Sequence, residues 1–233
     1  MTAFDSLKKY VCGKNITVVG IGISNMPLIR FLAENGAKVT ACDKKTQEEL
    51  GERAEELTNL GVSLVCGESY LDKLSGDIIF KTPGMRFDHP ALEHARSNGS
   101  VVTSEMEVFF EVCPAKIIAV TGSDGKTTTT TLIYKILTES GFKCHLGGNI
   151  GHPLLCETDS IDKNDIVVLE LSSFQLHTMK KSADVAVITN ISPNHLDMHK
   201  SYEEYIDAKK NIYLHQSEKG VLVVNKSDKM SFS

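Results

Sequence analysis

Short runs of β-branched and aliphatic residues alternate with helical stretches along the whole chain, and this alternation restricts the fold more than any other feature. In the first half the apolar runs are residues 16–19, 38–42, 62–65, 77–80 and 100–102. In the second half they are residues 116–121, 165–171, 184–189 and 220–224. Helical segments separate them, among them residues 28–32, 46–60, 91–98, 126–140 and 202–215. Such alternation predicts parallel sheets covered by helices, and therefore an α/β fold.

A change of pattern near residue 113 predicts two domains. A helical segment ends at Val112, Cys113 and Pro114, and a new series of strands begins at Lys116, because the residue before a proline disfavours helix. We therefore expect a Rossmann-like parallel-sheet domain over residues 1–113 and a P-loop-type α/β domain over residues 114–233. The second domain has few strands, so we expect it to be truncated and the chain to be cut from something longer.

Composition excludes several classes of protein. The 233 residues include 25 basic and 30 acidic side chains, a formal net charge of -5, whereas nucleic-acid binding requires a basic excess. No apolar run reaches the roughly 18–20 residues of a membrane helix, and the first residues lack the apolar core of a signal peptide, so we expect a cytoplasmic protein that binds neither nucleic acid nor membrane. The six cysteines form no C-x-x-C pair and are interpreted as reduced packing residues.

A glycine turn between a buried strand and a helix is the strongest local motif, at residues 117–131 (IIAVTGSDGKTTTTT). The loop residues are Gly122, Ser123, Asp124 and Gly125, and the helix begins with Lys126, Thr127 and Thr128. Backbone N–H groups at a helix N-terminus can bind phosphates, a lysine can reach the terminal phosphate, and a hydroxyl can bind Mg²⁺. Two residues separate the glycines, where the usual phosphate-loop pattern has four. The alternative is a glycine-rich turn that merely caps a helix.

A second glycine turn follows the first strand. Gly20 and Gly22 precede Asn25, which stands where a dinucleotide fingerprint has its third glycine, and Asp43 ends the next strand. Because the third glycine allows close helix–strand packing, its loss weakens the dinucleotide prediction. Three interpretations stay open at this point: an NAD site, a site for another nucleotide such as a UDP sugar, or a structural turn.

Four further polar residues are candidates for a site in the second domain. Glu170 ends a buried strand, where it could face phosphate and Mg²⁺ or simply meet solvent. Asn149, in the loop GGNIG, could bind a ligand or turn the chain. His195 follows the next strand, and its spacing to His199 resembles a zinc pair, but H-E-x-x-H is absent and we predict no zinc site. Helical periodicity places Lys209 on a solvated helix face.

Taken together and in this order, these segments resemble the Mur ligases over almost the whole chain. The similar segments are GIGISNMPLIRFL, KTPGM, SEMEVFF, TGSDGKTTTTTL, GGNIGHPLL, LELSSFQL, NISPNHLDMH and AKKNI. The shortened phosphate loop is itself a feature of that family. Within the family, SSFQL and GGNIG are typical of the member that adds D-glutamate.

The resemblance implies an ATP-dependent ligase of peptidoglycan synthesis that joins D-glutamate to UDP-N-acetylmuramoyl-L-alanine through an acyl phosphate. It also implies a cytoplasmic monomer with two Mg²⁺ ions. By similarity Lys126 contacts the β and γ phosphates, Thr127 and Glu170 serve one Mg²⁺, His195 serves the other, and Lys209 is the lysine that CO₂ carbamylates. The residues implied for the muramoyl nucleotide are Ile23, Ser24, Asp43, Thr82, Pro83, Gly84, Asn149, Ser173 and Gln175.

Two departures limit this expectation. The family has a third, C-terminal domain that binds the incoming amino acid, and the chain stops before it, so we expect the 233 residues alone to form no product. Asp124 adds a negative charge to the phosphate loop. The alternatives are another Mur-type ligase, or a module that binds a UDP sugar or a dinucleotide without turnover.

Overall fold

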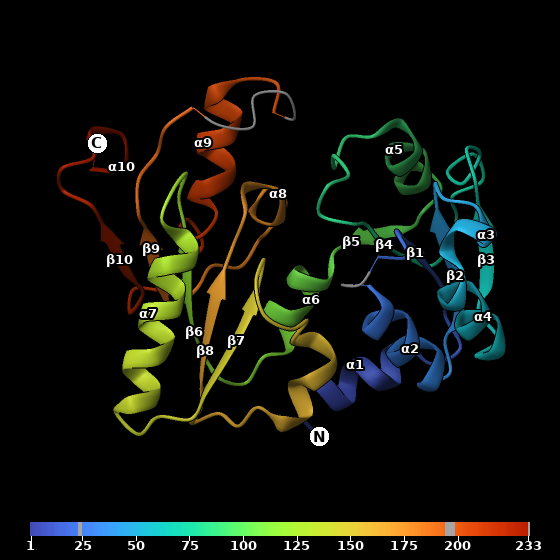
Figure 1. Cartoon of the computed structure of the whole chain (residues 1–233), viewed down its shortest axis with the longest axis horizontal. Helices are drawn as coiled ribbons and strands as arrows, with labels where there is room; N and C mark the ends of the chain where they lie inside the picture. Colours follow the sequence, from blue (N-terminus) through green and yellow to red (C-terminus); the bar gives the residue numbers. More distant parts are fainter. Residues whose placement is uncertain (23–24, 194–198, 233) are drawn as a thin grey trace. The chain divides into compact units, whose positions relative to one another are not determined.

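The structure is a computed structural model that describes residues 1–22, 25–193 and 199–232. It divides into two compact units, Met1–Val112 and Cys113–Ser233, and each unit is built on one five-stranded sheet (Figure 1). Every strand pair in both sheets is parallel. The α/β fold predicted from the alternating pattern is therefore confirmed.

The first unit has the strand order β3-β2-β1-β4-β5. Its strands are β1 (Asn15–Val19), β2 (Lys38–Asp43), β3 (Ser63–Cys66), β4 (Ile78–Phe80) and β5 (Val101–Thr103). Its helices are α1 (Ala3–Val11), α2 (Met26–Glu34), α3 (Gln47–Leu50), α4 (Glu52–Asn59), α5 (Pro90–Ser97) and α6 (Glu105–Val112). The chain leaves β1 toward β2 on one side and leaves β4 toward β5 on the other. The connections therefore change direction between β1 and β4, which makes this the position where open α/β sheets bind ligands.

Burial of aliphatic side chains holds the first sheet to its helices. Val19, Ile79 and Leu92 belong to one cluster of buried residues that joins β1, β4 and α5. On the opposite face α2 buries most of its aliphatic side chains and packs against β2. Because helices cover both faces of the sheet, side chains on both sides of each strand are buried, and the strands are continuous apolar runs in the sequence.

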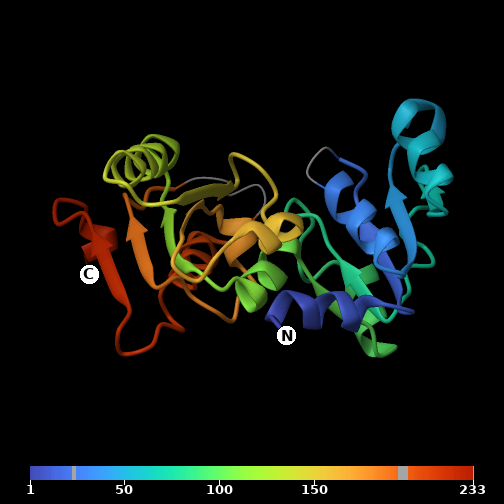
Figure 2. The same ribbon diagram turned by 90° about the horizontal axis from the view of Figure 1, so that it is seen from below.

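The second unit has the strand order β10-β9-β6-β8-β7. Its strands are β6 (Lys116–Thr121), β7 (Cys144–Gly148), β8 (Ile166–Glu170), β9 (Val185–Ile188) and β10 (Val221–Val224). Its helices are α7 (Lys126–Glu139), the 3₁₀ helix η1 (Leu155–Ser160), α8 (Ser173–Leu176), α9 (Tyr202–Lys210) and α10 (Lys229–Phe232). Figure 2 shows α7 on one face of this sheet and α9 on the other, so the carboxyl ends of β6 and β8 lie at an edge that both helices reach.

Three local predictions were wrong. The helix predicted over 46–60 is two helices, because Gly51 between α3 and α4 adopts φ +54°. The helix predicted over 202–215 ends as α9 at Lys210. The segment GGNIG was interpreted wholly as a loop, but Gly147 and Gly148 are the last residues of β7 and pair with Leu169 and Glu170. A side chain on Gly148 would overlap the carbonyl of Glu170, so glycine permits this pairing.

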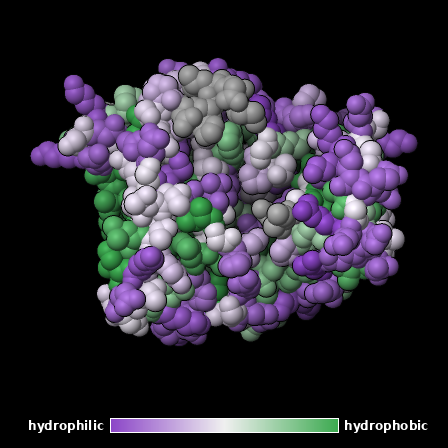
Figure 3. Space-filling view, in the orientation of Figure 1, coloured by the Kyte–Doolittle hydropathy of each residue, from purple (hydrophilic) through white to green (hydrophobic). Residues whose placement is uncertain are grey.

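Hydrophobic side chains are exposed along the outer strand of the second sheet. Val221, Leu222 and Val223 of β10 are each more than two-fifths exposed, and Figure 3 shows a hydrophobic strip at this edge of the unit. In the described ranges no helix is both long and apolar enough to cross a membrane.

Candidate active site

The phosphate-like loop of the sequence lies at the carboxyl edge of the second sheet, between β6 and α7. Its backbone is fixed from the end of β9: Ser123 N–H donates to the carbonyl of Asn190 at 2.9 Å, and Asp124 N–H donates to Asn190 Oδ1 at 3.1 Å. Thr189 Oγ1 and Asn190 Nδ2 donate to the carbonyl of Asp124 at 2.7 and 3.0 Å. These bonds hold the loop open in front of the helix N-terminus, where an anion is stabilised.

Gly122 is required by the close approach of β9. Its φ is +146°, and a Cβ at this position would overlap Thr189 Oγ1. Gly125 adopts a left-handed conformation with φ +77° and is the N-cap of α7, with no side chain to bond the first N–H groups of the helix. The first turn of α7 therefore has no side-chain cap, as a phosphate site needs.

Lys126 folds back over the loop. Its Nζ donates to the carbonyl oxygens of Gly122 at 3.1 Å and Ser123 at 2.9 Å. The side chain is only partly buried, so the ammonium can exchange these carbonyls for a phosphate oxygen. Thr128, the third polar residue of this turn, is exposed.

Glu170 is the acidic centre of the site. The residue is 2% exposed, and its carboxylate accepts hydrogen bonds from Thr127 Oγ1 at 2.7 Å and Asn149 Nδ2 at 2.9 Å. The backbone N–H of Asn149 also donates to the carbonyl of Glu170 at 2.8 Å. Three residues predicted from separate motifs thus meet at one point. The carboxylate and hydroxyl oxygens fit the ligands that Mg²⁺ prefers.

Lys209 is buried, contrary to the solvated position that its helical periodicity indicates. Its side chain is 2% exposed, and Nζ donates to Gly122 O at 2.8 Å and Thr121 Oγ1 at 3.2 Å. Burial, reinforced by the nearby Lys126 charge, lowers the pKa of Lys209 to about 7. The ammonium also lies 4.7 Å from the ring centre of Tyr205. A basic amine that is partly uncharged at neutral pH therefore lies beneath the phosphate loop.

Ser173 and Gln175 lie on the short helix α8 after Glu170, and both side chains already have partners. Ser173 Oγ is 2.9 Å from His199 Nε2. Gln175 Oε1 accepts from the N–H and hydroxyl of Ser172, each at 3.0 Å. Ser172 Oγ accepts from the N–H of Gln175 at 3.3 Å, which completes the capping box of α8. The motifs did not point to Ser172 as a site residue, and they brought in His199 only through its zinc-like spacing to His195.

The first unit places its candidates at the carboxyl edge of its own sheet. Asp43 Oδ2 accepts from Ile21 N–H at 2.6 Å, and Asp43 Oδ1 accepts from Lys45 N–H at 2.9 Å. The carboxylate therefore orders the glycine turn. A Cβ on Gly20 would lie 3.5 Å from Thr82 Cβ, so the segment of Thr82, Pro83 and Gly84 runs beside that turn.

Three predicted site residues, Ile23, Ser24 and His195, lie outside the described residues. In the part of the chain that is described, no group of three His, Cys, Asp or Glu side chains is arranged to hold a metal ion. The Thr127–Glu170 pair is the arrangement there that fits an Mg²⁺ site.

The motifs did not reveal residues that contact the loop but lie far from it in the sequence. Tyr205 is 1% exposed, and its hydroxyl is 2.8 Å from Ser123 Oγ. Ser123 Oγ also donates to Ser192 O and accepts from Ser192 N–H, both at 2.8 Å. Tyr205 precedes Lys209 by one helical turn, and this spacing is the one sequence signal that could have linked it to the site.

Two family models match the chain in succession. Residues 14–104 match the Mur ligase MurD-like, N-terminal domain, and residues 120–233 match the Mur ligase middle domain. The chain belongs to the Mur ligase family. The resemblance inferred from the motifs is confirmed.

Two clostridial relatives of this chain share one name with each other. It is 58% identical over 231 residues to the UDP-N-acetylmuramoylalanine--D-glutamate ligase of Clostridium kluyveri, and 54% identical over 231 residues to the ligase of that name from Clostridium tetani. Each match covers 99% of this chain and 50% of the relative. The chain thus spans about half the length of the curated relatives it matches.

Solved Mur ligases share the fold. The MurC UDP-N-acetylmuramate-alanine ligase of Thermotoga maritima is 25% identical, with a TM-score of 0.54 over 94% of this chain and 50% of that chain. The UDP-N-acetylmuramate:L-alanyl-gamma-D-glutamyl-meso-diaminopimelate ligase of Neisseria meningitides is 19% identical, with a TM-score of 0.59 over 94% and 73% of the two chains.

Proposed function

We propose that the chain forms the nucleotide-binding part of an ATP-dependent ligase that joins D-glutamate to UDP-N-acetylmuramoyl-L-alanine in peptidoglycan synthesis. Residues 1–113 would bind the uridine nucleotide and residues 114–233 would bind ATP. The observation that carries the proposal is Glu170, which accepts hydrogen bonds from Thr127 and Asn149 directly beside the phosphate loop. The names of the clostridial relatives support the choice of D-glutamate as the amino acid.

The proposed reaction has two steps. A carboxylate oxygen of the alanyl group attacks the γ-phosphorus of ATP, which forms an acyl phosphate and releases ADP. The amine of D-glutamate then attacks the acyl carbon, an amide forms, and phosphate and a proton leave. The backbone N–H groups of the loop and the Lys126 ammonium would stabilise the charge on the transferring phosphoryl group.

Oxygen ligands for the proposed Mg²⁺ come from Thr127 and Glu170, and the ion would neutralise phosphate charge when bound. A second ion at His195 is the further expectation from the family. Lys209 suits carbamylation because an amine reacts with CO₂ in its uncharged form, and the lowered pKa of about 7 makes that form abundant at neutral pH. The carbamate would replace a cation by an anionic oxygen group.

Binding of ATP tests the second unit. We expect Lys126→Ala to weaken Mg²⁺-ATP binding, measured by calorimetry, by about 10- to 100-fold, since a charged hydrogen bond contributes about 1.5–3 kcal/mol. Lys135→Ala, which removes an exposed lysine of the same helix, should leave the affinity unchanged. Equal ATP affinity in wild type and Lys126→Ala would contradict the proposed role of the loop.

A nucleotide-binding module without turnover is the alternative of a different class. The direction change between β1 and β4 favours it, because that position also suits NAD or a simple UDP sugar. Such a module would keep its function in Lys126→Ala, whereas the ligase needs that lysine. The monomeric state and the cytoplasmic location stay predictions.

A further inference from the structure

Residues 189–192 follow β9 and form a support segment for the phosphate loop. The first two residues of the segment bond to the backbone of Asp124. The last, Ser192, exchanges two hydrogen bonds with the Ser123 hydroxyl, both at 2.8 Å. The arrangement of the phosphate loop therefore depends on where the support segment lies, and the backbone of its remaining residue, Ile191, bonds to other elements.

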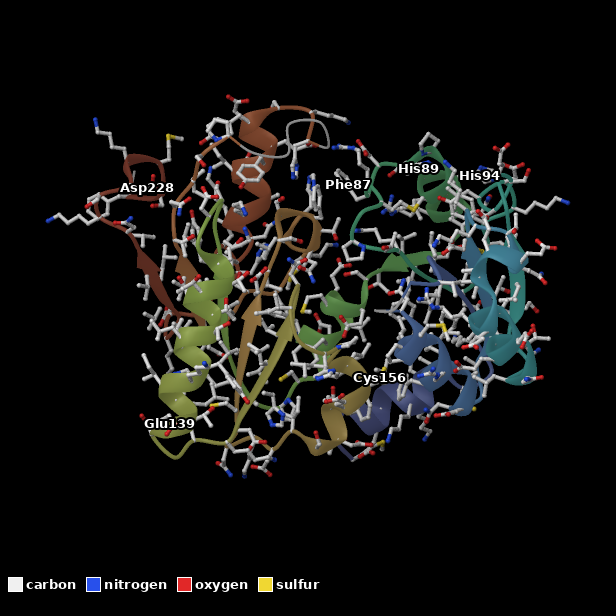
Figure 4. The ribbon with its side chains drawn as sticks, viewed as in Figure 1. Phe87, His89, His94, Glu139, Cys156 and Asp228 are labelled. Carbon is white, nitrogen blue, oxygen red and sulfur yellow. The ribbon has the colours of Figure 1, made fainter. Side chains whose placement is uncertain are left out.

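Asp228 fixes the support segment from the end of β10. Its Oδ2 atom accepts from the N–H of Ile191 at 3.0 Å. Asp228 lies in the segment between β10 and α10, and Figure 4 shows it at the upper end of β10. Because β9 and β10 are neighbouring parallel strands, the segments that leave their carboxyl ends start at the same edge of the sheet. One hydrogen bond joins these two segments across 37 residues of sequence.

The same carboxylate also caps the short helix α10, which accounts for only part of its contacts. Asp228 Oδ2 accepts from the N–H of Ser231 at 3.0 Å, as the side chain of an N-cap residue does. Helix α10 has four residues and buries none of them, so a cap stabilises little packing there. Hydrogen bonds from Ser231 and from the N–H of Ile191 lower the pKa of Asp228. The acceptor is therefore a charged carboxylate, which makes the stronger kind of hydrogen bond.

Tyr202 holds the other backbone group of Ile191. Its hydroxyl donates to the Ile191 carbonyl at 3.3 Å, and its ring stacks on Tyr205 with ring centres 6.2 Å apart and planes 19° apart. Ile191 itself is 6% exposed. The N–H, the carbonyl and the side chain of one residue are thus all fixed, in the middle of the segment that bonds to the phosphate loop.

We propose that Asp228 is a positioning residue for the phosphate loop and that it acts through the N–H of Ile191. This inference rests on the proposed function of the second unit, in which the loop binds the phosphates of ATP. The bond to Asp228 fixes Ile191, and the residues on either side of Ile191 hold Ser123 and Asp124 in place. Without that bond the loop is less ordered before ATP binds, and binding must then order it, which lowers the affinity.

Amide hydrogen exchange of the 233-residue chain without nucleotide tests the positioning directly. We expect Asp228→Ala to speed exchange of the Ser123 and Ser192 N–H groups by about tenfold or more, because their hydrogen bonds open when the support segment moves. The amides of the central strands β6 and β8 should exchange as in wild type. Glu218→Ala, which removes an exposed carboxylate before the amino end of β10, is the charge-matched control.

Binding of Mg²⁺-ATP, measured by calorimetry, gives the functional readout. We expect Asp228→Ala to weaken it by about 3- to 30-fold, the range for a residue that acts through a network of contacts. Asp228→Asn keeps an acceptor oxygen without the charge, so it should lie between wild type and Asp228→Ala in both measurements. Tyr202→Phe keeps the ring and removes the bond to the Ile191 carbonyl, and it should change both measurements in the same direction by a smaller factor.

Three results would overturn the inference. One is wild-type exchange at Ser123 and Ser192 in Asp228→Ala, or faster exchange confined to α10, which would reduce Asp228 to a helix cap. Another is wild-type ATP affinity in Asp228→Ala, and a third is an equal loss in Glu218→Ala.

Two further arms separate folding and the proposed function from the role of Asp228. If Asp228→Ala fails to fold, faster exchange at Ser123 in both Asp228→Asn and Tyr202→Phe supports the inference, and unchanged exchange in both overturns it. If the wild-type chain does not bind ATP, the proposed function of the second unit fails, and exchange at the loop still decides the role of Asp228.

Discussion

Lys209 illustrates how the surroundings of a residue change its chemistry. Its place on α9 resembles that of many solvated lysines, and sequence periodicity predicts no more than that. The fold buries it under the phosphate loop, 88 residues away in sequence from its partner Thr121. No local pattern encodes such a contact, which is why burial of Lys209 could not be predicted from the residues alone.

The lowered pKa of Lys209 predicts a pH-dependent contribution to stability. The folded pKa of about 7 is below the unfolded value of 10.5, so between these values the unfolded chain binds more protons and folding becomes more favourable as pH rises. In CO₂-free buffer, the free energy of unfolding of wild type relative to Lys209→Met should be flat below about pH 7. Above it, the difference should rise by at most about 1.4 kcal/mol per pH unit. A flat difference from pH 7 to 10 would show that the folded lysine stays charged.

Asp165 is a second buried charge, at the amino end of β8 and away from the candidate site. Its Oδ2 atom accepts from His145 Nε2 at 2.7 Å and Asp162 N–H at 3.0 Å and pairs with Lys143 Nζ at 2.8 Å. The hydrogen bond from Lys143 contributes most to holding the pKa of Asp165 well below its usual range.

We expect Asp165→Asn to destabilise the second unit by about 1–3 kcal/mol at neutral pH. A depressed carboxyl pKa stabilises the fold above the unfolded pKa near 3.8, and this contribution is lost as pH falls further. The free energy of unfolding in urea should therefore differ more between wild type and Asp165→Asn at pH 7 than at pH 3.5. Glu139→Gln, at the exposed end of α7 (Figure 4), is the control and should unfold like wild type at both values. An equal difference at both pH values would contradict the assignment.

At the scale of elements, α8 is fixed by residues of the segment before α9. The His199 ring stacks on Phe174, with ring centres 5.2 Å apart and planes 3° apart, and meets the edge of Tyr205 at 5.4 Å. With the Ser173 hydrogen bond at 2.9 Å, these contacts connect α8 to α9. Tyr205 connects α9 in turn to Ser123 of the phosphate loop. The loop and α8 are thereby held in one arrangement.

His199→Phe keeps the stacked ring and removes the hydrogen bond to Ser173. We expect it to weaken binding of UDP-N-acetylmuramoyl-L-alanine by about 3- to 10-fold, the effect of one neutral hydrogen bond, with little change in ATP affinity. Ser173→Ala should weaken binding of this nucleotide by about the same factor. The double variant should bind no more weakly than either single variant, because both substitutions remove the same hydrogen bond. Additive losses, or an equal loss for ATP, would show that His199 does not act through Ser173.

The elements that could be predicted are those whose own residues carry a pattern of apolar side chains and glycines. The strand, glycine turn and helix of β6 and α7 follow from apolar residues, Gly122 and Gly125, and the structure places them as expected. Strand β7 was missed because CHLGG at the edge of a sheet has no alternating pattern and ends in two glycines. The bonds from Thr189 and Asn190 to Asp124 connect residues 65 and 66 positions apart, and strand order alone brings them together.

At the scale of the whole molecule, the two units carry separate candidate sites of related design. In each, a glycine turn follows the first strand of the unit, and a buried lysine, Lys81 or Lys209, lies at the carboxyl edge of the sheet. In the proposed function, the edge of the first unit would bind the uridine nucleotide and the edge of the second would bind the phosphates of ATP. The motifs predicted the glycine turns and both sheets, whereas the burial of the two lysines emerged from the packing.

The central claim is that the chain binds a muramoyl nucleotide, and a calorimetric titration of the chain with UDP-N-acetylmuramoyl-L-alanine, run beside NAD and UDP-glucose, tests it most directly. The account predicts that the muramoyl nucleotide binds at least about tenfold more tightly than UDP-glucose, a difference of about 1.4 kcal/mol, and that NAD does not compete with it. Preferential binding of NAD, or equal affinity for the two UDP sugars, would contradict the account.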